Sequence, residues 1–181
     1  MWNIPNLLTS FRIFLIPVFL VIYYLPGPEA NFWAALVFVI AAITDALDGY
    51  VARKFNQFTA FGAFLDPVAD KVMVAAALVV VVEHYATWWI TIPALTIISR
   101  ELVVSALREW MAQIGRQGQV AVSNLGKLKT IAQMVALVGL LWEANTFVIV
   151  TATILLYLAF ALTLWSMWEY LRAAWADLSQ K

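Results

Sequence analysis

Residues 45–70 read DALDGYVARKFNQFTAFGAFLDPVAD, and the rest of the chain is organised around this stretch. It contains four carboxylates in two pairs, Asp45 with Asp48 and Asp66 with Asp70. The partners are three residues apart in the first pair and four in the second, and both spacings place a pair on one face of a helix. Apolar segments, 31–43 and 72–82, flank the stretch, so we expect the acids at the edge of a hydrocarbon layer. Acids in that position are costly unless they are compensated, and they therefore indicate a functional site.

A divalent metal is the compensation that best suits these acids. Hard cations such as Mg²⁺ take oxygen ligands and are commonly held by carboxylates together with substrate phosphates. Two helices that each bring two carboxylates can bind two ions, and a two-metal site clamps the attacking and leaving oxygens of a phosphoryl displacement. The alternative interpretation is a solvated loop with ordinary salt bridges, but such a loop has no need of this spacing.

The composition is that of an integral membrane protein. Of the 181 residues, 64% are hydrophobic and only 12% are charged, whereas a soluble domain carries about 25% charged residues. The mean hydropathy is +0.86. A net charge of zero argues against nucleic acid as a partner, and the absence of cysteine excludes disulfides and thiolate chemistry.

Hydropathy predicts six transmembrane helices in one all-α domain that covers residues 1–181. No internal repeat, low-complexity segment or linker divides the chain. The expected spans are 6–25, 31–55, 61–83, 88–114, 124–141 and 146–172.

The basic residues support this topology. Three of the expected turns, 26–31, 83–87 and 142–146, contain no Lys or Arg, and most of the cations fall at the opposite side. Because cytoplasmic loops carry an excess of Lys and Arg, both termini and the aspartate stretch are expected to face the cytoplasm. The sequence thus predicts an integral protein of the cytoplasmic (inner) membrane.

The pattern DxxDGxxAR, followed by eight residues and then GxxxDxxxD, resembles the signature of the CDP-alcohol phosphatidyltransferases, and every fixed position of that signature is present from Asp45 to Asp70. The resemblance extends over the whole six-helix layout. It implies an enzyme that transfers the phosphatidyl group of a CDP-lipid onto an alcohol with Mg²⁺ or Mn²⁺ and releases CMP. It also implies a homodimer, which is typical of the family.

The resemblance assigns roles to individual residues. It implies that Asp45, Asp48 and Asp66 are the principal metal ligands, and that Asp70 is a neighbouring ligand and the general base that accepts the proton of the attacking hydroxyl. The residues expected to bind the CDP-lipid, CDP-diacylglycerol, are Asn6, Thr9, Arg12, Gly49, Ala52, Arg53 and Gly62. For Arg53, a role as a basic anchor at the inner face of the membrane is the alternative.

A second cluster, of basic residues, predicts the site of the alcohol acceptor. Its members are Arg100, Arg108, Lys127 and Lys129. Arg100 lies well inside the expected span 88–114, and a charge at that depth usually faces the bundle interior and has a partner. A neighbouring acid such as Glu101 or Glu109 could neutralise these cations; the sharper hypothesis is a pocket for an acceptor that carries a phosphate.

The segments SRELVVSALREW (99–110) and VAVSNLGKLKT (120–130) also resemble the branch of the family whose acceptor is sn-glycerol 3-phosphate. That resemblance implies phosphatidylglycerol phosphate and CMP as products. Inositol phosphate is the nearest competing acceptor, and serine carries no phosphate for the cluster to bind. A small membrane transporter is a further alternative, but such proteins often show an internal repeat with binding near the bilayer midplane.

Overall fold

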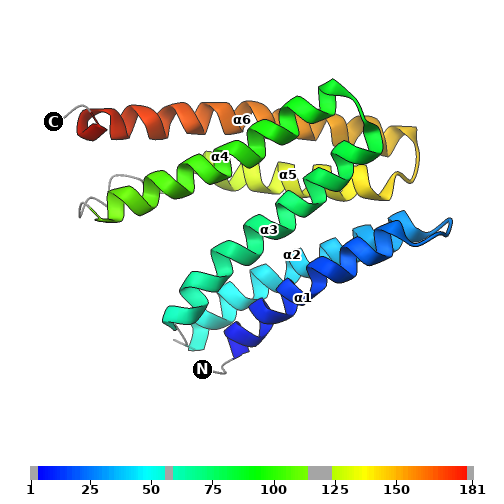
Figure 1. Cartoon of the computed structure of the whole chain (residues 1–181), viewed down its shortest axis with the longest axis horizontal. Helices are drawn as coiled ribbons and strands as arrows, with labels where there is room; N and C mark the ends of the chain where they lie inside the picture. Colours follow the sequence, from blue (N-terminus) through cyan, green and yellow to red (C-terminus); the bar gives the residue numbers. More distant parts are fainter. Residues whose placement is uncertain (1–3, 56–58, 114–123, 179–181) are drawn as a thin grey trace.

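The computed structural model describes residues 4–55, 59–113 and 124–178, and six helices account for nearly all of them (Figure 1). The helices are α1 (Ile4–Tyr24), α2 (Ala30–Phe55), α3 (Ala60–Tyr85), α4 (Trp88–Gln113), α5 (Asn124–Trp142) and α6 (Thr146–Leu178). The predicted ends lie within two residues of the observed ones, except that α6 continues to Leu178. The all-α class and the six helices are confirmed.

Four helices are long and apolar enough to cross a membrane, judged by length and composition over the described residues. These segments are Asn6–Tyr24, Ala30–Val51, Trp88–Gln113 and Thr146–Arg172. Helix α5 offers a shorter apolar segment, Leu128–Trp142, and α3 carries Asp66, Asp70 and Lys71 in its first half. The 33 residues of α6 extend about 50 Å at 1.5 Å per residue, which exceeds the roughly 30 Å of a hydrocarbon core.

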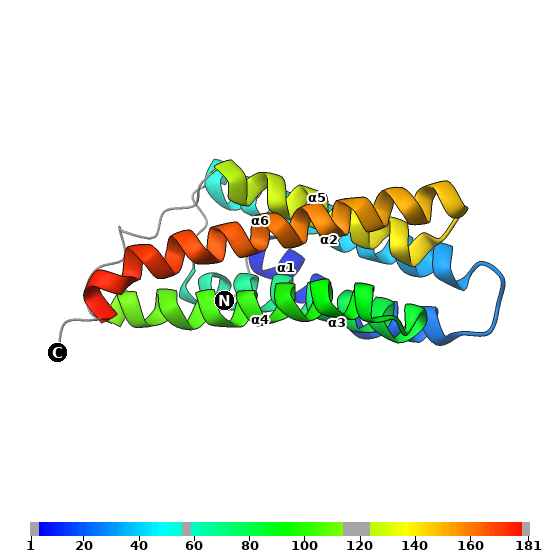
Figure 2. The same cartoon turned by 90° about the horizontal axis from the view of Figure 1, so that it is seen from above.

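The helices form two groups, and α2 and α3 of the first group contact helices of the second. Helix α1 packs on α2 and α3, while α5 packs on α6 and α2, and α4 packs on α6 and α3. In Figures 1 and 2 the helices run back and forth along the long axis, so the turns 24–30, 85–88 and 142–146 gather toward one end. The first turns of α1 and α3 and the last turns of α2 lie toward the other end. The aspartate stretch is therefore remote from the turns that lack Lys and Arg.

Close packing between the helices depends on small and aromatic residues. The rings of Phe19 in α1 and Phe38 in α2 are both fully buried, with their centroids 6.3 Å apart. In the second group, a Cβ added to Gly139 of α5 would lie 2.7 Å from the Cβ of Ala152 in α6. The missing side chain lets the two backbones approach, as small residues do at helix interfaces in membranes.

At the end of the molecule opposite the aspartates, one carboxylate connects three helices. Glu143 follows α5 and has a positive φ of 52°, a conformation that favours glycine. Its carboxylate accepts a hydrogen bond from Asn31 Nδ2 of α2 at 3.1 Å and lies 2.8 Å from His84 Nε2 of α3. A glycine here would relieve the backbone but would remove the side chain that ties these helix ends together.

Candidate active site

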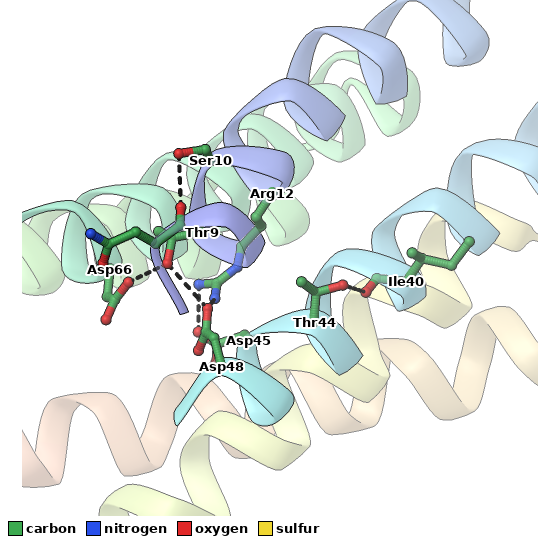
Figure 3. Close-up of polar contacts among 9 residues, drawn as sticks. Thr9, Ser10, Arg12, Ile40, Thr44, Asp45, Asp48 and Asp66 are labelled. Atoms are coloured by element: carbon green, nitrogen blue, oxygen red, sulfur yellow. Dashed lines mark hydrogen bonds and ion pairs between the residues drawn. The ribbon is translucent and has the colours of Figure 1, made fainter. Parts of the chain in front are cut away.

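Arg12 of α1 is the centre of the first half of the site, and its side chain is almost completely buried. One guanidinium nitrogen, Nη1, lies 2.5 Å from Asp45 Oδ1, and the other, Nη2, donates to Asp48 Oδ2. Asp45 and Asp48 project together from α2 toward α1, as the three-residue spacing predicts (Figure 3). The buried cation therefore compensates two of the four acids.

Thr9, one turn before Arg12, connects the two aspartate pairs. Its hydroxyl lies 3.3 Å from Asp48 Oδ2 on α2 and donates a shorter hydrogen bond to Asp66 Oδ1 on α3. Figure 3 shows Asp48 and Asp66 on either side of the Thr9 hydroxyl. The structure thus brings Asp45, Asp48 and Asp66 together around the first turns of α1.

Asn6 and Gly62 meet where α1 crosses the start of α3. Thr59 caps α3 by accepting a hydrogen bond from the Gly62 backbone N–H at 3.0 Å, and its own hydroxyl donates to Asn6 Oδ1 at 3.0 Å. A Cβ on Gly62 would lie 2.6 Å from that same Asn6 oxygen. Gly62 therefore permits close approach, and the group that approaches is the buried side chain of Asn6.

The Gly62→Ala variant is expected to be less stable than the wild type by about 1–3 kcal/mol, because the new methyl group overpacks the contact with Asn6. The measurement is the thermal unfolding midpoint in detergent. Gly27→Ala is the matched control, because a Cβ at Gly27 would meet no atom within 4 Å. Equal unfolding midpoints for the two variants would contradict the proposed packing.

The oxygen donors of this cluster suit a hard divalent cation, because Mg²⁺ and Mn²⁺ prefer carboxylate ligands. Within residues 4–55, 59–113 and 124–178, however, no group of three His, Cys, Asp or Glu side chains is arranged to hold an ion as it stands. In Figure 3 one oxygen of each of Asp45, Asp48 and Asp66 is directed toward Arg12 or Thr9. The donor chemistry fits a metal, and binding would require these oxygens to turn from their present partners.

Asp70 lies one helical turn beyond Asp66 and lines a cavity of about 170 Å³ among α3, α4, α5 and α6. The cavity is also lined by three cations and by one further acid, Glu101; the cations are Lys71, Arg100 and Lys129. Three cations and two acids leave a surplus of one positive charge. Asp70 is thus the acid of the motif that faces the basic cluster predicted from the sequence.

Two of the predicted cations share one carboxylate. Glu101 Oε1 accepts a hydrogen bond from Lys129 Nζ at 2.6 Å and from Arg100 Nη1 at 3.0 Å. Neutralisation by Glu101, the alternative weighed above, therefore describes part of the arrangement. It leaves two cations against one carboxylate, and both cations still line the cavity.

Helix α6 supplies site residues that the sequence analysis did not identify. Arg100 Nη2 donates to Ser166 Oγ at 3.2 Å, and the Arg100 guanidinium lies 5.5 Å from the ring centroid of Tyr170. Tyr170 also lines the cavity. The four-residue spacing of Ser166 and Tyr170 places them on one face of α6, but nothing in the sequence indicates which helix that face meets.

Several predicted residues cannot be placed in the same detail. Gly49 lies in α2 directly after Asp48. The side chains of Ala52, Arg53, Arg108 and Lys127 lie outside the described part of the structure, so their predicted roles remain predictions.

Comparison with known proteins finds similarity along most of the chain. The family model described as CDP-alcohol phosphatidyltransferase matches residues 2–165. The chain is 58% identical over 177 residues to the CDP-diacylglycerol–glycerol-3-phosphate 3-phosphatidyltransferase of Escherichia coli K12, covering 98% of this chain and 97% of that protein. It has the same identity and coverage with the proteins of that name from Shigella flexneri serotype 5b and Shigella sonnei.

Proposed function

Because this chain belongs to the CDP-alcohol phosphatidyltransferase family, we propose that it transfers the phosphatidyl group of CDP-diacylglycerol to sn-glycerol 3-phosphate, giving phosphatidylglycerol phosphate and CMP. The observation that carries this proposal is the 58% identity, along nearly the whole length, to a protein named for that reaction. Family membership also favours an enzyme over the alternative of a membrane transporter.

The cavity beside Asp70 is the proposed acceptor site. Its volume of about 170 Å³ is below the roughly 300 Å³ at which sites for drug-sized ligands begin, and so it suits a small acceptor rather than the CDP-lipid. Arg100 and Lys129 would bind the acceptor phosphate with charge-assisted hydrogen bonds, with Arg108 and Lys127 as further candidates. This arrangement would leave the far hydroxyl of glycerol 3-phosphate toward Asp70.

Asp70 is the proposed general base. The acceptor hydroxyl oxygen forms a bond to the phosphorus that carries the diacylglycerol, and its proton passes to the Asp70 carboxylate. The bond between that phosphorus and the oxygen of CMP breaks, and CMP leaves with the electron pair. Asp70 suits this role because it lines the acceptor cavity and is one turn from Asp66 in the carboxylate cluster.

The family is in general dependent on a divalent metal. We propose Mg²⁺ or Mn²⁺, as two ions, with Asp45, Asp48 and Asp66 as ligands and Asp70 as a neighbouring ligand. When bound, such ions supply positive charge to the phosphate oxygens and to the leaving group. The proposed CDP-lipid site adjoins these acids and consists of Asn6, Thr9, Arg12, Gly49, Ala52, Arg53 and Gly62.

The helices and the charges of the enzyme support a proposal for its location. It is a membrane protein with a bacterial relative, and we propose the inner membrane, with both termini and the site facing the cytoplasm. In that orientation the lipid donor arrives from the bilayer and the polar acceptor from the cytoplasm. We further propose that residues 1–181 form one catalytic domain and that two copies associate as a homodimer.

The test is release of CMP by the purified protein in detergent micelles that contain CDP-diacylglycerol and Mg²⁺. Glycerol 3-phosphate, inositol phosphate, inositol and serine are supplied one at a time. We expect CMP release with glycerol 3-phosphate and with none of the other three acceptors. Addition of a chelator is expected to abolish this release. Release with a different acceptor would retain the family chemistry and refute the acceptor assignment. Folded protein that releases no CMP with any of them would refute the function.

A further inference from the structure

Gln133 of α5 is a buried polar residue that neither the motif nor the basic cluster includes. Its side chain lines the cavity with Asp70, Arg100 and Lys129, and only 4% of the residue is exposed. Its Oε1 is buried and has no hydrogen-bond partner among the residues that the structure describes. Buried polar atoms are nearly always hydrogen-bonded, so an unpaired oxygen on a residue that lines a cavity points to a ligand that donates to it.

The position of Gln133 is defined by its neighbours on α5. It follows Lys129 by four residues, so the two side chains lie on the same face of the helix, one turn apart. Because α5 runs from the aspartate end toward the opposite end, Gln133 lies deeper in the bundle than Lys129. Val74 and Met134 also line this part of the cavity, and both are apolar.

Two carboxylates of the cavity, Glu101 and Asp70, already have a use, and Thr130 and Tyr170 also have partners. Glu101 Oε1 accepts from Arg100 and Lys129, and Asp70 is the proposed base for the attacking hydroxyl. The basic side chains have no acceptor atoms at all. A second hydroxyl group on the acceptor molecule needs an oxygen to accept its hydrogen bond, and among the described residues that line the cavity Gln133 supplies a buried oxygen without a partner.

We propose that Gln133 Oε1 accepts a hydrogen bond from the hydroxyl of the phosphorylated acceptor that does not attack, which in glycerol 3-phosphate is the hydroxyl on C2. The proposal rests on the function proposed above and adds a specificity-determining residue to it. The cations select the phosphate, Asp70 takes the proton of the terminal hydroxyl, and Gln133 selects acceptors with a hydroxyl on the carbon between them.

The test compares two acceptors, glycerol 3-phosphate and 3-hydroxypropyl phosphate, which lacks only the C2 hydroxyl. The readout is the ratio of their kcat/KM values for CMP release. In the wild type we expect this ratio to be at least about tenfold, because the analogue leaves Gln133 Oε1 unpaired. In Gln133→Met, which keeps the approximate volume and removes the oxygen, the ratio is expected to fall by about tenfold, through loss of activity with glycerol 3-phosphate.

Two variants serve as controls. Gln133→Glu retains an acceptor oxygen, so it should preserve the ratio even if the added charge weakens both acceptors. Thr163→Val removes a different buried oxygen, on α6, which has no partner among the described residues and does not line the cavity, so this variant should also preserve the ratio.

Some outcomes would overturn the proposal. The proposal is refuted if the wild-type enzyme uses both acceptors equally well. It is also refuted if the ratio of kcat/KM values for Gln133→Met equals that of the wild type. In both cases the proposed function would stand, because glycerol 3-phosphate would still be used. Absence of CMP release by the wild type with either acceptor would instead refute the function and the inference together.

Discussion

The Asp70→Asn variant is expected to fold and insert normally and to release CMP more slowly than the wild type by two to four orders of magnitude. Asn keeps the shape of the side chain but cannot accept the proton of the acceptor hydroxyl, and a positioned general base typically contributes that much to the rate. The location of Asp70 is consistent with this expectation, since it lines the cavity with Arg100 and Lys129. The measurement is the initial rate of CMP release at saturating concentrations of both substrates.

Glu83→Gln is a suitable control for this experiment. Glu83 lies near the far end of α3 and accepts a hydrogen bond from Tyr24, so it shares the helix with Asp70 but not the site. We expect its rate to be within about twofold of the wild type. Turnover of Asp70→Asn at a rate close to that of Glu83→Gln would remove Asp70 from the mechanism.

The Arg12→Met variant should lower the free energy of unfolding by about 3–5 kcal/mol. Removing one partner of a buried ion pair leaves the other charge uncompensated, and Asp48 is itself buried. Asp45 would lose the same cation, although it is partly exposed. The thermal unfolding midpoint in detergent, without added divalent metal, measures the effect.

Lys54→Met provides the comparison for Arg12→Met. Lys54 is exposed on the same side of the molecule and lies 5.5 Å from the ring centroid of Tyr50, so its loss should change stability by less than about 1 kcal/mol. If both variants unfold at the same temperature, Arg12 is not the residue that holds the aspartates. Adding Mg²⁺ should raise the midpoint of Arg12→Met, because the freed carboxylates gain a cation.

The sequence predicted the helices well because their signals are local. Apolar length, turn residues and the distribution of Lys and Arg set the ends of α1 to α5 within two residues. The span predicted within α6, 146–172, agrees with the apolar segment Thr146–Arg172, and the helix continues to Leu178. The hydrophobic pattern ends at Arg172, but a helix can continue beyond the apolar segment.

The part of the site that was predicted is the part that depends on the spacing of residues along a single helix. The spacing placed Asp45 beside Asp48, and that is observed. Contacts between helices were available from the sequence only in part: neutralisation of the cations by Glu101 was one alternative, whereas the position of Thr9 between Asp48 and Asp66 was not predicted. Gln133 was missed for a different reason, since a single amide in an apolar helix gives no motif, and its unpaired oxygen appears only once the neighbours are in place.

The ion pairs of Arg12 have a consequence for how this protein matures. In small zinc domains the ligands repel one another until the metal arrives, so that folding waits for the ion. Here the chain supplies its own countercharge to Asp45 and Asp48, from a residue that is inserted with α1. If Asp45 and Asp48 hold the proposed ion, assembly in the bilayer does not depend on the supply of metal, and the finished protein is expected to stay folded when that ion exchanges.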